Sequence, residues 1–259
     1  MKRVTSFVGT NRKKSTYNAV RQFLENLKTL CDVEYEIVIL NHHRLETCRG
    51  CKRCFSMGEE FCPLRDDRDM LLDKMMASDG VIFATPNYSF QVSATMKMFL
   101  DRLGFAFHRP RFFGKTFTSI VSQGIYGGDK IVEYLDFVGA GLGFNTVKGS
   151  CLTAFEPMTE KEKQRIDKTL AEHSRRFYEG LRKPAYPLPT LLKLWAFRMA
   201  RTSIGLMLDD SIRDYTYFRD KGWFTSDYYY PTRLGPLKKA AGGLFDSMAT
   251  SSVTKRGEN

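Results

Sequence analysis

The sequence lacks the features of membrane-spanning, exported and repetitive proteins. Its 259 residues contain no run of about 18 uncharged apolar residues, which excludes a transmembrane helix. Met1 to Arg3 lead directly into an alternating strand pattern and not into the apolar core of a signal peptide, so we expect a cytoplasmic location. No internal repeat is present.

Blocks of like charge are also lacking, although one sign predominates. The chain has 40 Lys and Arg against 29 Asp and Glu, a net charge of +11. Such a charge favours phosphorylated cofactors, polyanions or acidic membrane surfaces, or is simply a basic surface. Because the basic residues are scattered, we expect no nucleic-acid partner. Aromatic residues make up 13% of the chain and can supply a core, which excludes general disorder.

Cysteine is scarce but unevenly distributed. We expect Cys31 and Cys151 to be buried small hydrophobic residues. The remaining four, Cys48, Cys51, Cys54 and Cys62, lie within about 15 residues of one another, which indicates metal or redox chemistry and not a disulfide framework. Their spacing, with Pro63 after the last, is typical of thiolates around an iron–sulfur cluster. Zinc and a loop of thiols without metal are the alternatives. The four histidines have no metal-ligand spacing, and we expect them at ordinary surface or edge positions.

Strand and helix signals alternate over the first two-thirds of the chain. Strands are expected at 4–8, 33–40, 80–84, 116–122 and 144–152, and helices at 15–30, 69–77, 92–107, 129–138 and 159–181. Thr159 and Glu162 have the spacing of a capping box. This alternation predicts an α/β fold with a doubly wound five-stranded parallel sheet that helices cover on both faces.

Three prolines between Lys183 and Pro189 indicate a boundary. We therefore predict one domain over residues 1–183, carrying the cysteine loop at 48–62, and a C-terminal extension of helices and aromatic residues over 184–259. A basic amphipathic helix is expected at 191–208, which packs on the core or a second subunit, or lies on a membrane surface. We expect fraying from Ser247 onward.

Ligands of doubly wound sheets bind at the carboxyl ends of the strands, so three loops matter most. The loop after the first strand contains the hydroxyls of Thr10, Ser15 and Thr16 and the guanidinium of Arg12. Hydroxyls and a cation at a helix N-terminus are suited to a phosphate monoester. The loop is neither a Walker loop nor a GxGxxG motif. The structural alternative is that Ser15 is only a helix cap.

The loops after the third and fourth strands complete the predicted pocket. We expect Pro86 to end the strand ladder, while Tyr88 and Phe90 could flank a flat ring and Asn87 could bond its edge. In the loop at 123–128, glycines permit close approach of the main chain to a ligand. Together the three loops predict a pocket for a planar heterocycle that carries a phosphate.

The segments GTNRKKST, ATPNYSFQVSATMKMFLDR and SQGIYGG resemble the flavodoxin-like NAD(P)H-dependent FMN reductases, and the loop CRGCKRCFSMGEEFCPLRDD resembles the iron–sulfur flavoproteins of that superfamily. The resemblance covers residues 1–181 and implies bound FMN, NAD(P)H as co-substrate and a homodimer or higher homo-oligomer. It implies that the phosphate is held by Thr10, Arg12, Ser15, Thr16 and Tyr17. It implies that the isoalloxazine ring is enclosed by Thr85, Pro86, Asn87, Tyr88, Ser89, Phe90, Gly124, Tyr126, Gly127 and Gly128. For the cysteine loop it implies a [4Fe–4S] cluster on Cys48, Cys51, Cys54 and Cys62, with zinc or no metal as the open alternatives.

The implied function is an FMN-dependent oxidoreductase that takes hydride from NAD(P)H and passes electrons to a small-molecule or protein acceptor. The chemistry belongs to the flavin, so we nominate no general acid or base. Arg102, Arg109 and Arg111 could recognise a dinucleotide phosphate; alternatively, Arg102 pairs with Asp101 or Asp79. The alternatives are a flavodoxin-type electron carrier that does not use NAD(P)H, and a cysteine-based redox or metal sensor that binds a partner through its C-terminal segment.

An aromatic cluster occupies the C-terminal extension. It consists of Tyr215, Tyr217, Phe218, Trp223, Phe224, Tyr228, Tyr229 and Tyr230. Two roles are open: it caps the flavin site of its own or a neighbouring subunit, or it is a separate hydrophobic cluster that stabilises the extension.

Overall fold

The computed structural model describes residues 1–155 and 157–257, which form two compact units. The first unit comprises residues 1–49 and 64–185, and the second comprises residues 50–63 and those from 186 onward. The division in the C-terminal half thus falls two residues after the proposed boundary at 183. The segment 50–63, which contains most of the cysteine loop, groups with the C-terminal region instead of with the sheet.

The first unit is built on a parallel sheet. Its strands are β1 (Lys2–Val8), β2 (Val33–Ile39), β3 (Gly80–Pro86), β4 (Thr116–Gln123), β5 (Asn145–Thr146) and β6 (Ser150–Thr153). The order is β2-β1-β3-β4, and β5 and β6 both pair with the outer edge of β4. All these pairs are parallel, which confirms the predicted flavodoxin-like α/β fold.

The expected fifth strand at 144–152 is divided into β5 and β6. At the division, the N–H of Gly149 donates to the carboxylate of Asp136 (3.2 Å) and not to the ladder. A Cβ at Gly149 would overlap the hydroxyl of Ser119 on β4. The glycine therefore allows the edge to approach β4 closely where the ladder is interrupted.

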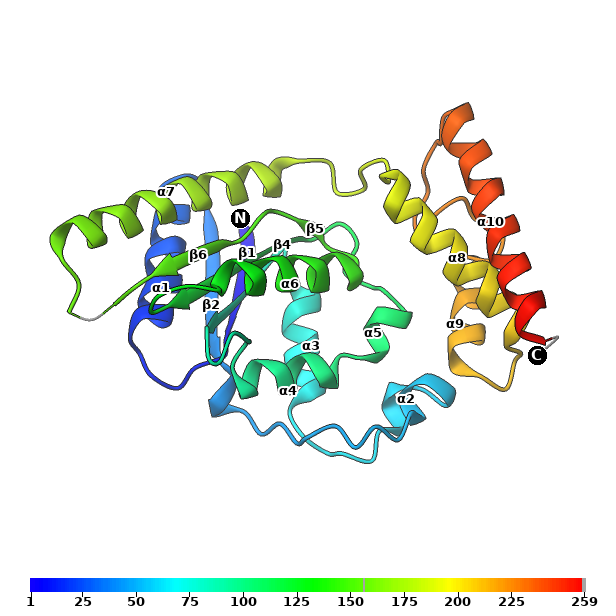
Figure 1. Cartoon of the computed structure of the whole chain (residues 1–259), viewed down its shortest axis with the longest axis horizontal. Helices are drawn as coiled ribbons and strands as arrows, with labels where there is room; N and C mark the ends of the chain where they lie inside the picture. The colour runs from blue at the N-terminus through cyan, green and yellow to red at the C-terminus, as the bar shows by residue number, and fades with distance from the viewer. Residues whose placement is uncertain (156, 258–259) are drawn as a thin grey trace. The chain divides into compact units, whose positions relative to one another are not determined.

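Helices cover both faces of the sheet, as predicted (Figure 1). They are α1 (Ser15–Lys28), α3 (Arg68–Ala77), α4 (Ala94–Arg102), α5 (Phe105–His108), α6 (Gly128–Gly141) and α7 (Glu160–Arg182), with a 3₁₀ turn η1 (Leu40–His42). On the face of α1 and α7, Phe23 and Phe177 pack edge to face. On the other face, Phe7 of β1 stacks on Phe99 of α4. The capping box at Thr159 and Glu162 is present at the start of α7.

Two local expectations differ from the structure. The expected helix at 92–107 is interrupted at Gly104, so α4 ends at Arg102 and α5 begins at Phe105. The expected strand at 80–84 continues for two more residues, and β3 ends at Pro86, opposite Ser122, so the proline is the last residue of the ladder as expected. The next hydrogen bond runs from the N–H of Asn87 to the carbonyl of Ser122 (2.7 Å), so the ladder needs no donor at the proline.

The second unit is helical. It contains α2 (Arg53–Ser56), a 3₁₀ turn η2 (Glu59–Phe61), α8 (Leu191–Met207), α9 (Arg213–Asp220) and α10 (Pro236–Gly257). Helices α8 and α10 pack side by side (Figure 1), and α2 contacts η2 and α9. The expected fraying from Ser247 is wrong over the described residues, because α10 continues to Gly257. None of the described helices combines the length and the apolarity needed to cross a membrane.

The aromatic cluster forms the core of the second unit, as the stabilising alternative predicts. Phe218, Trp223 and Tyr228 are buried. The indole N–H of Trp223 donates to the carbonyl of Tyr229 (3.0 Å), and the ring of Phe197 on α8 meets that of Tyr229 at 4.5 Å. The rings thus hold α8 to the segment that follows α9.

Charged side chains lie between α8 and α10. The guanidinium of Arg198 donates to Asp227 (2.6 Å) and Asp246 (2.9 Å), and Arg201 donates to Asp246 (2.8 Å). Arg201 also donates to the carbonyl of Ser226. The two arginines of α8 are therefore directed inward, toward acceptors of the same unit.

His173 of α7 is fully buried, so the expectation of a surface or edge position is wrong for this residue. Its Nε2 lies 2.7 Å from the hydroxyl of Thr118, and its ring packs against Phe23. Burial, with a smaller effect of Arg176, lowers its pKa to about 3. The first unit therefore holds this imidazole in its neutral form.

The buried imidazole predicts a loss of stability in acid. The unfolded chain takes up a proton at His173 below about pH 6.5, whereas the folded chain does not. Neutral His173 therefore contributes to the free energy of unfolding above about pH 6.5. This contribution is lost as the pH falls toward about 3, the pKa of His173 in the folded protein. Between about pH 6 and 4.5, the free energy of unfolding of the unmodified protein should fall more steeply than that of His173→Gln, by up to about 1.4 kcal/mol per pH unit.

Urea unfolding followed by circular dichroism measures this difference. His42→Gln, at an exposed position of η1, is the matched control and should leave the slope unchanged. Equal pH slopes for the unmodified protein and His173→Gln would contradict the prediction.

Candidate functional site

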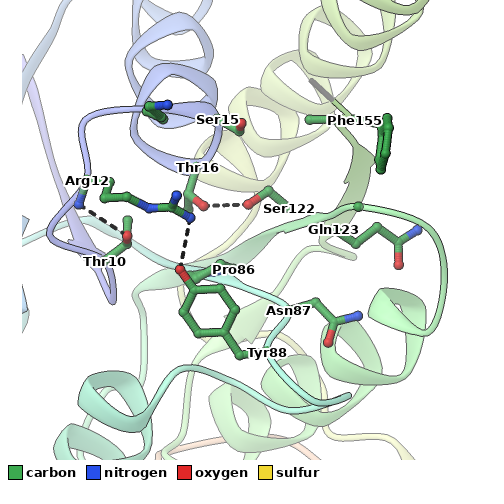
Figure 2. A pocket seen from close by; sticks show the side chains of 13 residues that line it. Thr10, Arg12, Ser15, Thr16, Pro86, Asn87, Tyr88, Ser122, Gln123 and Phe155 are labelled. Carbon is green, nitrogen blue, oxygen red and sulfur yellow. Dashed lines mark hydrogen bonds between the residues drawn. The ribbon is translucent and has the colours of Figure 1, made fainter. Parts of the chain in front are cut away.

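A cavity of about 210 Å³ lies in the first unit, at the carboxyl ends of β1, β3 and β4 (Figure 2). It is lined by Thr10, Arg12, Lys14, Ser15, Thr16, Pro86, Asn87, Tyr88, Ser122, Gln123, Gly124, Ala154 and Phe155. The three predicted loops therefore contribute to one cavity. Their strands end at the same sheet edge because β1, β3 and β4 are parallel neighbours.

The loop between β1 and α1 makes the first wall. The hydroxyl of Thr10 accepts from the N–H of Arg12 (3.3 Å), and the guanidinium of Arg12 donates to the hydroxyl of Tyr88 (3.2 Å; Figure 2). Helix α1 has no acidic residue in its first turn. The positive end of the helix dipole, Arg12 and Lys14 therefore make this wall electropositive.

A buried contact joins the start of α1 to the end of β4. The hydroxyls of Thr16 and Ser122 form a hydrogen bond, and both residues are buried (Figure 2). The first turn of α1 and the last residues of β4 both line the cavity, so this bond joins two of its walls.

The loop after β3 makes a tight turn with backbone in uncommon conformations. Tyr88 and Gln91 exchange backbone hydrogen bonds of 3.0 and 2.9 Å. Between them, Ser89 and Phe90 both have positive φ angles, 49° and 61°. Two successive non-glycine residues in the left-handed region store strain, and such strain is concentrated at functional sites.

The loop after β4 is tied to the loop after β3. The amide of Asn87 donates to the carbonyl of Tyr126 (3.0 Å). Gly127 has φ of 90°, and a Cβ there would lie 2.6 Å from the ring of Phe90. The N–H of Gly128 donates to the side chain of Gln123 (2.7 Å). Glycine at 127 is thus required both by the backbone angle and by the aromatic ring beside it.

About half of the residues nominated from the sequence line this cavity. They are Thr10, Arg12, Ser15, Thr16, Pro86, Asn87, Tyr88 and Gly124. The others, Tyr17, Thr85, Ser89, Phe90, Tyr126, Gly127 and Gly128, lie in or beside the same loops but do not line it. Thr85 is fully buried, where its hydroxyl accepts from the N–H of Ser93 (2.9 Å). Its role is to hold the start of α4 against the end of β3.

Sequence reasoning missed five lining residues: Lys14, Ser122, Gln123, Ala154 and Phe155. Ser122 is the last residue of the expected strand at 116–122 and Gln123 is the first residue of the expected loop at 123–128, but neither was nominated as a site residue. Ala154 and Phe155 follow β6, which ends at the same sheet edge. The signal that could have identified them is that every parallel strand of the sheet, the fifth included, delivers its following loop to this edge.

The arginines nominated for a dinucleotide phosphate are not at the cavity. Arg102 bonds to Asp66 (2.7 Å), and the two side chains are 2% and 1% exposed. The expected partners Asp101 and Asp79 are wrong, since they bond to Lys97 and Lys2. Burial alone would raise the pKa of Asp66, but hydrogen bonds from Arg102 and from the N–H of Glu46 hold it below its ordinary value. Arg109 is also fully buried, and Arg111 is half-buried.

The cysteines are not gathered as metal ligands. Within residues 1–155 and 157–257, no group of three or more His, Cys, Asp or Glu side chains is arranged to hold a metal ion. Cys48 and Cys51 are exposed, Cys54 is half-buried and Cys62 is buried. Cys51, Cys54 and Cys62, which belong to the second unit, are therefore not arranged around a metal ion, and Cys48 belongs to the first unit. Cys31 and Cys151 are half-buried, and burial raises the pKa of the Cys151 thiol to about 11, which makes it a poor nucleophile.

Comparisons with known proteins identify relatives of the sheet unit. The family model for NADPH-dependent FMN reductase matches residues 2–156. An iron–sulfur flavoprotein of Archaeoglobus fulgidus is 32% identical over 162 residues, which cover 57% of this chain and 70% of that protein. An iron–sulfur flavoprotein of Clostridioides difficile (strain 630) is 26% identical over 222 residues, which cover 82% of this chain and 93% of the relative.

A solved structure extends the likeness of fold along the chain. The crystal structure of RosB with bound 8-demethyl-8-formylriboflavin-5'-phosphate has a TM-score of 0.56 and 12% identity, with 91% of this chain and 92% of that chain covered. At that identity the likeness shows the fold alone. The family model, by contrast, spans more than half of the chain and includes every lining residue of the cavity. The chain therefore belongs to the NADPH-dependent FMN reductase family and is an FMN-dependent oxidoreductase.

Proposed function

We propose that the cavity binds FMN with the phosphate at the start of α1 and the ring beside the loops after β3 and β4. The observation that carries the proposal is the convergence of an electropositive helix start with an aromatic and amide-bearing turn on one cavity. When bound, FMN accepts hydride from NAD(P)H and passes electrons to a second acceptor. The protein positions the flavin, provides positive charge for its phosphate and leaves the ring accessible to NAD(P)H.

The phosphate end is served by residues with matching chemistry. Thr10 and Ser15 offer hydroxyls, and Arg12 and Lys14 offer positive charge, all on the cavity wall. A guanidinium bonded to an anionic oxygen makes a stronger hydrogen bond than one bonded to a neutral hydroxyl. Arg12, which now donates to Tyr88, would therefore gain by turning to a phosphate.

Aromatic side chains and a glycine line the part of the cavity that would hold the isoalloxazine ring. Tyr88 and Phe155 present exposed aromatic rings to the cavity, and Gly124 leaves room for the main chain to approach a ligand edge. An added Cβ at Gly124 would have its nearest neighbour, Phe155, at 4.0 Å. Asn87 is already bonded to Tyr126, so it holds the two turns at a constant separation.

Replacing Arg12 should weaken the binding of FMN selectively. Charge-assisted hydrogen bonds contribute about 1.5–3 kcal/mol, so the Kd of Arg12→Gln for FMN should rise about 10- to 100-fold. Riboflavin, which lacks the phosphate, should bind both proteins within about twofold. Quenching of flavin fluorescence on titration into apoprotein measures both constants. Arg21→Gln removes the same charge from the exposed surface of α1 and is the control; equal losses for FMN and riboflavin would contradict the assignment.

Direct hydride transfer tests the function itself. Anaerobic mixing of the FMN-loaded protein with NADPH or NADH should bleach the flavin band near 450 nm, as stopped-flow absorption records. Reduction by dithionite but by neither nicotinamide would instead identify a flavodoxin-type electron carrier. Comparing the two donors also gives the preferred one.

The cysteine loop has conflicting support for a [4Fe–4S] cluster. The spacing of Cys48, Cys51, Cys54 and Cys62 and the names of the relatives favour a cluster, whereas the three cysteines of the second unit are not arranged around a metal ion. We therefore derive no step through a cluster. Iron and acid-labile sulfide analysis of anaerobically purified protein separates the alternatives, with zinc measured in the same sample.

Hydride transfer should be independent of this loop. Cys51 belongs to the segment 50–63, whose residues do not line the cavity. Cys51→Ser should keep the rate of flavin reduction by NAD(P)H within about twofold of the unmodified rate in stopped-flow measurements. A loss of tenfold or more would show that the thiol takes part before the flavin is reduced.

We also propose a homodimer in which a second copy covers the edge of the cavity. Phe90, Ile125 and Tyr126 expose large apolar side chains on the two turns beside it. Exposed apolar groups next to a binding site are typical of interaction surfaces. A single-chain mass in sedimentation velocity of the FMN-loaded protein would contradict this dimer.

A further inference from the structure

Four leucines are exposed at one end of the second unit. Leu188, Leu191, Leu192 and Leu237 are each between 54% and 87% exposed, and we call them the leucine end. They come from the segment before α8, the first turn of α8 and the first turn of α10. Isolated exposed leucines are ordinary, but a contiguous group of them marks an interaction site.

Two hydrogen bonds bring these segments together. Lys238 at the start of α10 donates to the carbonyl of Pro189 (2.7 Å), and the hydroxyl of Tyr230 donates to the carbonyl of Pro187 (2.6 Å). The rings of Tyr186 and Tyr230 meet at 5.1 Å. The prolines and tyrosines therefore hold the first turns of α8 and α10 next to each other, with their leucines outward.

Helix α8 buries Leu194 and Phe197 but also directs two charged side chains inward. Arg198 and Arg201 face the interior of the unit, where Asp227 and Asp246 bind them. Trp195 and Leu206, by contrast, are exposed. Apolar side chains that stay exposed beside such a helix are suited to an interaction surface.

The charge around the leucine end is of one sign. Residues 186–208 and 228–245 contain no Asp or Glu. Their basic residues are Lys193, Arg198, Arg201, Arg233, Lys238 and Lys239. With Arg198 and Arg201 paired inward, the others remain beside the leucines, and Arg233 and Lys239 are exposed. A partner that binds the leucine end must therefore offer an apolar region for the leucines and negative charge for the basic residues.

We propose that the leucine end docks on the surface of an anionic lipid bilayer. The leucines would enter the boundary between headgroups and acyl chains, and Arg233, Lys238 and Lys239 would lie at the headgroups. Basic residues close to an anionic membrane are attracted to its surface potential. A second copy of this chain is a poorer occupant, because two basic ends repel each other.

Vesicle binding by the full-length protein tests the proposal. The protein should sediment with vesicles of phosphatidylcholine containing about 30% phosphatidylglycerol and at least about tenfold less with phosphatidylcholine alone, at about 0.1 M salt. The triple variant Leu188→Ser, Leu192→Ser, Leu237→Ser should lose binding at least about tenfold. Leu30→Ser, an exposed leucine of the first unit, is the control and should bind like the unmodified protein.

The charge contribution is tested separately. Arg233→Glu with Lys239→Glu should weaken binding to the anionic vesicles at least about tenfold. Lys161→Glu with Lys168→Glu changes the net charge equally on the exposed side of α7 and should have a smaller effect. Equal losses in the two double variants would show attraction by net charge alone and would overturn the proposal.

Tryptophan fluorescence reports which part of the chain meets the lipid. Trp195 is exposed one turn from Leu192, whereas Trp223 is buried. Anionic vesicles should shift the emission to the blue in the unmodified protein and not in Trp195→Phe. Circular dichroism and flavin reduction should be unchanged in the leucine variant, which separates lost docking from lost folding. Absence of binding to anionic vesicles would overturn the proposal. So would sedimentation velocity that finds a dimer for the unmodified protein and a monomer for the triple leucine variant.

Discussion

The parallel pairing of β1, β3 and β4 is the constraint on which the site depends. Because neighbouring parallel strands run in one direction, they end at one edge, and each must be followed there by a loop. Ala84 pairs with Val8 and with Ile120, so the three ends are in register. Slippage of one strand would separate the helix start at Ser15 from the turn at Tyr88.

Side-chain hydrogen bonds then hold the loops that the sheet assembles. Thr16 to Ser122 connects the start of α1, which follows the first loop, to the end of β4, which precedes the third, and Asn87 to Tyr126 connects the second and third loops. Arg12 to Tyr88 connects the first and second. The walls of the cavity are thus bonded to one another directly, which organises the cavity for a ligand before one arrives and reduces the entropy lost on binding.

The two units use charge in opposite ways. In the sheet unit, Asp66 and Arg102 form a buried ion pair, and the positive charge of Arg12 remains at the cavity. In the helical unit, Arg198 and Asp246 are used to join helices, and apolar side chains are left outside. The first arrangement suits the binding of a phosphorylated cofactor. The second suits the proposed docking of the leucine end on a lipid bilayer.

The sequence by itself determined the α/β fold, the order of its elements and the three loops of the site, because hydrophobic period and turn residues are local signals. It did not place Phe155 at the cavity, since that depends on where the divided fifth strand ends. Nor did it show Arg102 bonded to Asp66 or His173 inside the core, because the partners are 36 and 55 positions away in the chain. The grouping of residues 50–63 with the C-terminal helices was likewise decided by tertiary packing alone. Long-range contacts of this kind depend on which surfaces the folded chain brings together, and local sequence carries no record of them.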